Sequence, residues 1–322
     1  MAAELEHQVL RIDAVREAAE RIAPYVVRTP LLRYPLRRDC ELLLKPESLQ
    51  PTGAFKLRGA FNLMLQLPET CPGVVAHSSG NHAQAVARAS AVLGIPAVIV
   101  MPSDAPPRKR ERPEAVGAEV FFVGPDCVER AQRARELEEE RGLFPVPTFD
   151  DPGFAAGQGT AALELLEDAG SIDRFYAPLS GGGLMSGCAV VVNALAPAAE
   201  IVGVEPEDAN DTRLSLASGE RRKVPPPRTI ADGLRVRTPG AWTWTVLKEL
   251  LSRVELVSDA EMLDAMRFAL HQLRLVLEPS GAASLALALR EGQGRCGVLL
   301  SGGNVDDALL AQVAATPRCS RG

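Results

Sequence analysis

The sequence has few aromatic residues, no concentration of one charge and no paired cysteines. Phe, Trp and Tyr make up 4% of its 322 residues, and 35 Lys and Arg are interspersed with 41 Asp and Glu, for a net charge of -6. A nucleic-acid-binding surface needs a basic face or a set of stacking aromatic side chains. We therefore expect no nucleic-acid partner.

The cysteines and the hydrophobic runs exclude further classes of protein. The six cysteines are scattered and never form a CxxC pair, which disfavours a zinc site and a disulfide framework. The N-terminal segment is charged and lacks the apolar core of a signal peptide, and no apolar run is long enough to cross a membrane. The sequence therefore predicts a cytoplasmic, globular protein with no membrane partner.

Short apolar strands alternate with helical patterns along most of the chain. The clearest strands are the segments 74–77, 97–101, 119–123, 175–179, 201–205 and 297–301. This alternation predicts an α/β fold whose parallel sheets are covered on both faces, with ligands bound at the carboxyl ends of the strands. We expect two domains, a large one formed by residues 1–63 and 150–322 and a small one formed by residues 64–149.

The segment 52–60 (Thr-Gly-Ala-Phe-Lys-Leu-Arg-Gly-Ala) has the pattern of a helix start with Thr52 as its N-cap. Lys56 lies on the stripe that contains Ala60, whereas Arg58 begins a separate polar stripe. Burial would lower the pKa of this lysine and make its amine a nucleophile able to form a Schiff base with a carbonyl cofactor. The alternative is a lysine that extends from the helix edge into water.

Three turns that follow strands carry glycine or polar residues. Residues 180–183 (Ser-Gly-Gly-Gly) open a helix, where converging N–H groups favour a phosphate. The same glycines could form a tight turn or, with Gly187 and Glu205, a loose dinucleotide fingerprint. Residues 78–82 (Ser-Ser-Gly-Asn-His) could hold a substrate carboxylate or simply cap a helix, and residues 301–304 (Ser-Gly-Gly-Asn) place a hydroxyl at the sheet edge.

These segments, taken in order, resemble the fold-type II pyridoxal-phosphate-dependent enzymes of the serine/threonine dehydratase and serine racemase family. The resemblance runs from Ile22 to Asp306 and includes KPESLQPTGAFKLRGA, SSGNHAQAVA, AGQGTAALEL, PLSGGGLMSG, GVEPEDAND, ADGLRV, LEPSGAASLA and LLSGGNVD. It implies a tryptophan synthase β-like fold, with two parallel-sheet α/β domains and pyridoxal 5'-phosphate (PLP) between them. Two positions depart from the family pattern, since Ser180 replaces a frequent Gly and Ala54 replaces the usual Ser.

The resemblance also implies roles for individual residues. Lys56 would be the Schiff-base lysine and catalytic base, and Ser79 would be the acid/base group on the opposite face in racemases of this group. The cofactor would be held by Phe55, Lys56, Asn81, Ser180, Gly181, Gly182, Gly183 and Ser301, and the substrate by Ser78, Ser79, Gly80, His82 and Phe149. Glu205, the Ala209 carbonyl and Asp211 match a Mg²⁺ or Mn²⁺ site, since such ions prefer hard oxygen ligands.

The expected reaction is β-elimination from a 3-hydroxy amino acid such as L-threonine or L-serine, which yields a 2-keto acid and ammonia. A pyridine nitrogen that faces a neutral serine is less firmly protonated, which favours prompt loss of a β-hydroxyl group. Racemisation of serine is the alternative, and a nicotinamide-dependent oxidoreductase is a more distant one. The family resemblance also implies a homodimer. The sequence does not indicate which 3-hydroxy amino acid is the substrate.

Overall fold

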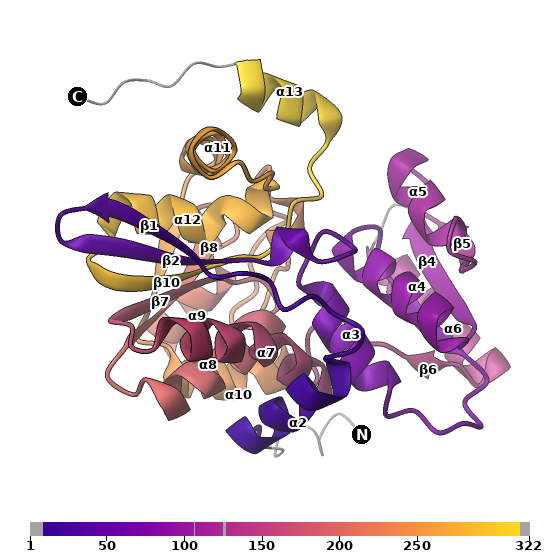
Figure 1. Ribbon diagram of the computed structural model, residues 1–322. Helices are drawn as coiled ribbons and strands as arrows, with labels where there is room; N and C mark the ends of the chain where they lie inside the picture. Colours follow the sequence, from indigo (N-terminus) through magenta and orange to yellow (C-terminus); the bar gives the residue numbers. More distant parts are fainter. Residues whose placement is uncertain (1–8, 106, 125–126, 316–322) are drawn as a thin grey trace.

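The structure, a computed structural model, describes residues 9–105, 107–124 and 127–315 and contains two β-sheets flanked by helices (Figure 1). The six-stranded sheet has the order β1-β2-β10-β7-β8-β9, and the four-stranded sheet has the order β5-β4-β3-β6. β1 (Leu32–Arg37) pairs with β2 (Cys40–Pro46) in the antiparallel direction, and the other strand pairs are parallel. The α/β prediction is therefore confirmed, with one antiparallel edge strand that it did not include.

The six-stranded sheet lies between two layers of helices (Figure 1). Its other strands are β7 (Arg174–Pro178), β8 (Glu200–Pro206), β9 (Arg253–Val257) and β10 (Gly294–Leu300). One face packs against α2 (Ile12–Ile22), α7 (Pro152–Ala169), α8 (Gly183–Leu195) and α10 (Ala241–Leu250), and the other against α11 (Asp259–Phe268) and α12 (Pro279–Glu291). The same part of the fold also contains the short helices η1 (Glu47–Leu49) and η2 (Asp232–Leu234), the π-helical turn η3 (Ala269–Leu273), α9 (Asp211–Ser218) and α13 (Asp307–Ala315).

The four-stranded sheet is formed within residues 74–145. Its strands are β3 (Val74–His77), β4 (Ala97–Pro102), β5 (Glu119–Val123) and β6 (Phe144–Pro145). α3 (Lys56–Met64) and α4 (Asn81–Leu93) pack on one face, α6 (Cys127–Arg141) packs on the other, and α5 (Pro107–Glu114) contacts α4. The predicted domain boundaries at 63/64 and 149/150 stay a prediction.

Helix α3, which begins with Lys56, lies between α4 of the smaller sheet and α7 of the larger one (Figure 1). Glycines permit this close packing. A Cβ atom at Gly157 of α7 would lie 2.6 Å from the Arg58 carbonyl oxygen, and one at Gly159 would lie 2.7 Å from the Gly187 carbonyl oxygen of α8. The AGQGT segment therefore brings three helix backbones together, because only glycine leaves room for such an approach.

A buried ion network, formed by Lys45, Glu47, Arg58 and Glu164, anchors α3 to its surroundings. The Arg58 guanidinium donates to Glu47 Oε2 at 2.7 Å and to Glu164 Oε1 at 2.7 Å, and Lys45 Nζ lies 2.6 Å from Glu164 Oε2. Burial alone would raise the pKa of Glu47, but the Arg58 charge beside it lowers that pKa overall. Two cations and two anions compensate one another inside the protein, so the network satisfies charges that would otherwise be costly to bury.

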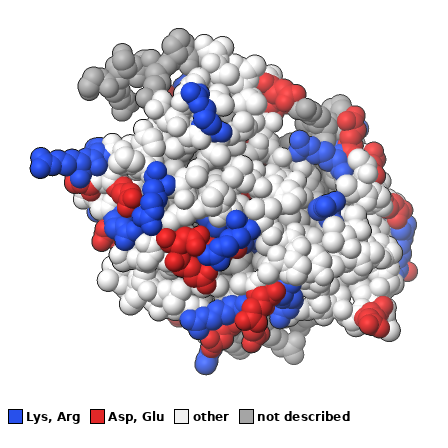
Figure 2. All heavy atoms as spheres, viewed as in Figure 1, with Lys and Arg blue, Asp and Glu red and all other residues white. Residues whose placement is uncertain are grey.

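The surface carries both charge signs. On the face shown in Figure 2, Lys and Arg side chains are interspersed with Asp and Glu, and neither sign covers a large area. Within the described part of the chain, none of the helices combines the length and the apolar character needed to span a membrane.

Candidate active site

Lys56 is the first residue of α3, and its amine lies among aromatic side chains. Lys56 Nζ donates to the Thr148 carbonyl oxygen at 2.5 Å and lies 5.2 Å from the ring centroid of Phe55 and 5.4 Å from that of Phe154. Burial lowers the pKa of Lys56 from 10.5 to about 7. A large fraction of this amine is therefore neutral near pH 7, as a nucleophile or a general base requires.

The start of α3 differs from the prediction. Phe55, and not Thr52, occupies the N-cap position, and no side chain caps the helix; the Thr52 hydroxyl is buried without a partner in the described residues. The prediction of Thr52 as the N-cap is therefore wrong. Arg58, on the polar stripe of this helix, is also fully buried, because it takes part in the ion network.

The glycine loop, residues 180–183, connects β7 to α8. Gly182 has a φ of 97°, a conformation that glycine adopts without strain. The Ser180 hydroxyl is buried and has no partner in the described residues. The loop leads into a helix N-terminus, where unpaired N–H groups and the helix dipole favour an anion. The orphaned hydroxyl and the helix start both fit a phosphate group here.

The segment Thr148-Phe149 contacts both Lys56 and the glycine loop. Thr148 accepts the hydrogen bond from Lys56, and the ring of the next residue covers the loop, since a Cβ atom at Gly181 would lie 2.3 Å from the Phe149 ring. A Cβ atom at Gly183 would lie 2.6 Å from the Phe149 carbonyl oxygen. Lys56 and the predicted phosphate loop therefore share one neighbouring segment. Phe149 is in contact with this loop, and its role toward the substrate side chain stays a prediction.

Ser301 and Asn81 lie at the carboxyl edges of the two sheets. The Ser301 carbonyl accepts the Phe55 N–H at 3.0 Å, which places the last strand of the larger sheet directly behind the lysine segment. The Ser301 hydroxyl lies 3.4 Å from the Ser280 carbonyl oxygen. Asn81 Nδ2 donates to Glu278 Oε1 at 2.6 Å, so the starts of α4 and α12 meet next to Gly302 and Ala54. Sequence reasoning missed Glu278, although it lies in the LEPSGAASLA motif.

The predicted substrate loop precedes α4. The Ser78 hydroxyl accepts the Gly80 N–H at 3.2 Å, and the Ser79 side chain is partly exposed. His82 is buried, with Nε2 lying 3.1 Å from the Val146 carbonyl oxygen. Burial, and then the nearby charge of Lys56, lower the pKa of His82 to about 3, so its imidazole is neutral. The substrate roles of these four residues stay a prediction.

The predicted metal ligands lie between the end of β8 and the start of α9. Glu205 and Asp211 are buried, and the Glu205 carboxylate accepts the N–H groups of Thr212 and Arg213 at 2.9 and 3.0 Å. Neither carboxylate oxygen of Asp211 has a partner among the described residues. Burial raises the pKa of Glu205 to about 7, and burial together with Glu205 raises that of Asp211 to about 8.

Two buried acids, one of them orphaned, fit a hard cation. Within residues 9–105, 107–124 and 127–315, however, no group of three His, Cys, Asp or Glu side chains surrounds a common point, so the remaining ligands would be backbone oxygens or water.

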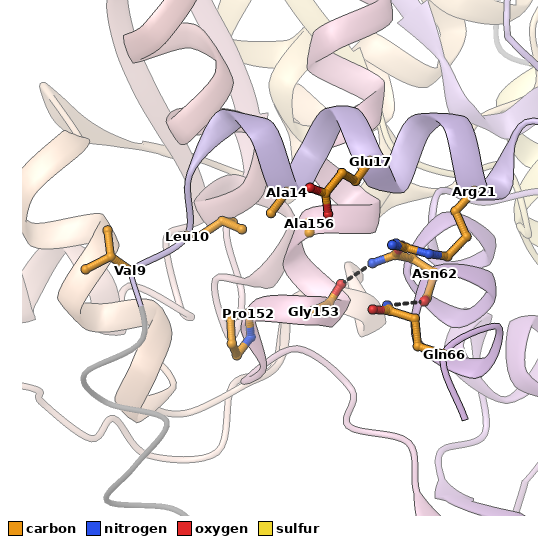
Figure 3. A pocket seen from close by; sticks show the side chains of 10 residues that line it. All are labelled: Val9, Leu10, Ala14, Glu17, Arg21, Asn62, Gln66, Pro152, Gly153 and Ala156. Atoms are coloured by element: carbon orange, nitrogen blue, oxygen red, sulfur yellow. Dashed lines mark hydrogen bonds between the residues drawn. The ribbon is translucent and has the colours of Figure 1, made fainter. Parts of the chain in front are cut away.

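A surface cavity of about 280 Å³ lies elsewhere, between α2, α3 and the start of α7 (Figure 3). Arg21 and Asn62 are among its lining residues and hydrogen-bond to each other, and Asn62 Nδ2 donates to the Gly153 carbonyl oxygen. None of the predicted site residues lines this cavity.

Comparison with known proteins agrees with this arrangement. The profile of the family described as "Pyridoxal-phosphate dependent enzyme" matches residues 22–302. An L-threo-3-hydroxyaspartate ammonia-lyase from Pseudomonas sp is 42% identical over 91% of this chain and 94% of its own length. The serine racemase of Schizosaccharomyces pombe is 40% identical over the same shares of the two chains.

Solved structures of similar fold also belong to ammonia-releasing enzymes and racemases of this kind. The crystal structure of the T.th. threonine deaminase superposes with a TM-score of 0.88 at 44% identity, and covers 92% of this chain and 99% of its own. Maize serine racemase superposes with a TM-score of 0.89 at 38% identity, over 95% and 97% of the two chains. The family match and these superpositions show that the chain belongs to the pyridoxal-phosphate-dependent enzymes and has their fold type II architecture.

Proposed function

We propose that this protein is a PLP-dependent ammonia-lyase that converts a 3-hydroxy amino acid into a 2-keto acid and ammonia. The observation that carries the proposal is the position of the Lys56 amine, which donates to the Thr148 carbonyl beside the glycine loop and lies near the Phe55 and Phe154 rings. Burial there lowers its pKa to about 7, which suits a nucleophile and a base near neutral pH. Relatives named for elimination from threonine and from 3-hydroxyaspartate support this class of substrate. Family membership favours PLP over a nicotinamide cofactor.

In this proposal each group of the site has a defined role. PLP, when bound, supplies the electron-withdrawing ring that acidifies the substrate Cα–H. Lys56 would hold the cofactor and take the Cα proton, and residues 180–183 would bind its phosphate with the Ser180 hydroxyl and the N–H groups at the start of α8. Phe55 and Asn81 would contact the ring. Ser301 would face its nitrogen as a neutral group.

The loss of the β-hydroxyl as water follows removal of the Cα proton, and hydrolysis of the released enamine gives the keto acid and ammonia. The loop that contains Ser78, Ser79, Gly80 and His82 would hold the substrate carboxylate with its hydroxyl and backbone N–H groups. His82 would act only as a neutral group, because the pKa of its imidazole is about 3.

The test begins with purified protein supplemented with PLP. We expect a visible absorbance band, and after borohydride reduction we expect mass spectrometry to find the cofactor on Lys56. Incubation with L-threonine, L-serine and L-threo-3-hydroxyaspartate should then release a keto acid from at least one of them, and Lys56→Ala should abolish this release. PLP-loaded protein that yields no keto acid from any of the three would overturn the proposal.

Serine racemisation is the second candidate, and the position of Ser79, a partly exposed residue in the loop before α4, favours it. A racemase needs a second acid/base group on the face of the substrate opposite Lys56. Relatives named serine racemase share about 40% of their residues with this chain. We expect Ser79→Ala to abolish any conversion of L-serine to D-serine while retaining part of the elimination from L-serine. Equal loss of both reactions would argue against this role of Ser79.

Three further predictions accompany the proposed function. Glu205, the Ala209 carbonyl and Asp211 would bind Mg²⁺ or Mn²⁺, as the orphaned Asp211 carboxylate supports. A homodimer would be detected by light scattering of the eluting protein. A cytoplasmic location would be tested by cell fractionation.

A further inference from the structure

Asp150 binds the start of a helix that is distant in sequence. Its Oδ2 accepts the Ala241 N–H at 2.7 Å, and its Oδ1 accepts the N–H groups of Trp242 and Thr243 at 3.0 and 3.1 Å. These are the first three residues of α10, and the N-cap residue Gly240 supplies no capping side chain. Asp150 therefore satisfies three N–H groups that the helix itself leaves unpaired.

The same helix start holds the glycine loop. Thr243 Oγ1 donates to the Gly181 carbonyl oxygen at 2.6 Å, and the Gly240 N–H donates to that oxygen at 3.1 Å. In a planar trans peptide the C=O and N–H groups point in opposite directions. Because α10 fixes the direction of the Gly181 carbonyl, it also directs the Gly182 N–H away from α10.

Close packing leaves this arrangement little freedom. A Cβ atom at Gly240 would lie 2.2 Å from Asp150 Oδ1, and one at Gly182 would lie 2.7 Å from a Leu247 methyl group and 2.9 Å from the Thr243 side chain. The Phe149 ring, adjacent to Asp150 in the chain, contacts Gly181. Phe149 therefore covers the glycine loop, and the next residue, Asp150, anchors α10, the helix that supports this loop.

We propose that Asp150 is a positioning residue for the phosphate-binding loop. Through the start of α10 and the Thr243 hydroxyl, it orients the Gly182 N–H toward the phosphate of PLP. Asp150 does not itself contact the phosphate. This inference rests on the proposed function only in that residues 180–183 bind the PLP phosphate.

The experiment measures the affinity of the apoprotein for PLP and the ³¹P resonance of the bound phosphate. Thr243→Val removes the hydroxyl donor at nearly constant volume, and we expect roughly fivefold weaker PLP binding and a shifted resonance, since one net hydrogen bond corresponds to about that factor. Thr243→Ser keeps the donor and should remain within about twofold of the native affinity. Asp150→Ala should weaken binding at least as much as Thr243→Val.

Asp151→Ala is the matched control, because Asp151 caps α7 by accepting the Phe154 N–H at 2.7 Å and makes no hydrogen bond to α10 or the glycine loop. It should lower the thermal midpoint without changing PLP affinity or the ³¹P resonance. Native affinity and resonance in both Asp150→Ala and Thr243→Val would overturn the inference.

The native protein separates the two proposals. If it binds PLP but releases no keto acid, only the proposed function fails, whereas absence of PLP binding overturns both. If Asp150→Ala does not fold, the Thr243→Val and Thr243→Ser pair decides the inference.

Discussion

The low pKa of Lys56 predicts that this residue destabilises the protein when no cofactor is bound. In the folded apoprotein burial lowers that pKa from 10.5 to about 7, whereas in the unfolded chain the amine keeps the higher value. The unfolded state therefore binds more protons between pH 7 and 10.5, and the stability of the native apoprotein should rise with pH across this window. Lys56→Met keeps the length of the side chain and removes the ionisable group.

The size of the effect follows from the two pKa values. At pH 8 the difference between the folded and unfolded pKa values corresponds to a free energy of unfolding about 3 kcal/mol higher in Lys56→Met apoprotein than in native apoprotein. This is an upper value, because the hydrogen bond to Thr148 partly stabilises the charged amine in the native protein. The gain in the free energy of unfolding should be largest below pH 7 and should disappear near pH 10.5. The free energy of unfolding in urea, measured on both apoproteins from pH 6 to pH 10, gives this dependence.

The control replaces an exposed lysine. Lys223 is exposed in a segment without helix or strand, and Lys223→Met should stay within about 0.5 kcal/mol of the native protein at every pH. A Lys56→Met apoprotein that is no more stable than the native one at pH 7 or 8, or whose advantage grows toward pH 10, would refute the assigned burial of this amine.

Three other substitutions test other parts of the structure. Arg58→Met leaves the buried Glu47 carboxylate without its salt-bridge partner and should lower the free energy of unfolding by about 3–5 kcal/mol in urea, whereas a loss below about 1 kcal/mol would contradict the buried network. Gly181→Ala places a methyl group 2.3 Å from the Phe149 ring and should weaken PLP binding in an equilibrium titration; unchanged affinity would show that the loop yields easily. Asp211→Asn should abolish any rise in thermal midpoint that Mg²⁺ causes in the native protein, and an equal rise in both would place the cation elsewhere.

Local patterns were sufficient to predict the main elements of the fold. The apolar runs at β3, β4, β7 and β8 are short and bounded by turn residues, so their type and position follow from the sequence alone. The glycines at 181–183 also indicated a loop at the end of a strand. Phe55 and the small residues near Lys56 could also be predicted, because they lie on the same helix or within one turn of it, whereas Phe154 of α7 could not.

Contacts between distant segments could not be predicted in this way. Arg58 appears polar in the pattern of α3, but its partner Glu164 lies 106 positions later and makes the burial possible. The contact between Asp150 and the start of α10 joins residues 91 positions apart, and neither end carries a recognisable motif. Helix α10 itself was not predicted. Such pairs are specified by tertiary packing, which no local period in the sequence reports.

The buried ion network has a consequence for how the protein folds while it is being synthesised. Lys45, Glu47 and Arg58 are synthesised early, but Glu164 follows only after a further hundred or so residues. Until α7 has left the ribosome, the guanidinium of Arg58 has only one of its two carboxylates, and the lysine helix lacks the surface on which it packs. We therefore expect a nascent chain stopped before residue 160 to leave Lys56 open to amine-modifying reagents. The Lys56 amine would become buried only after α7 has been translated.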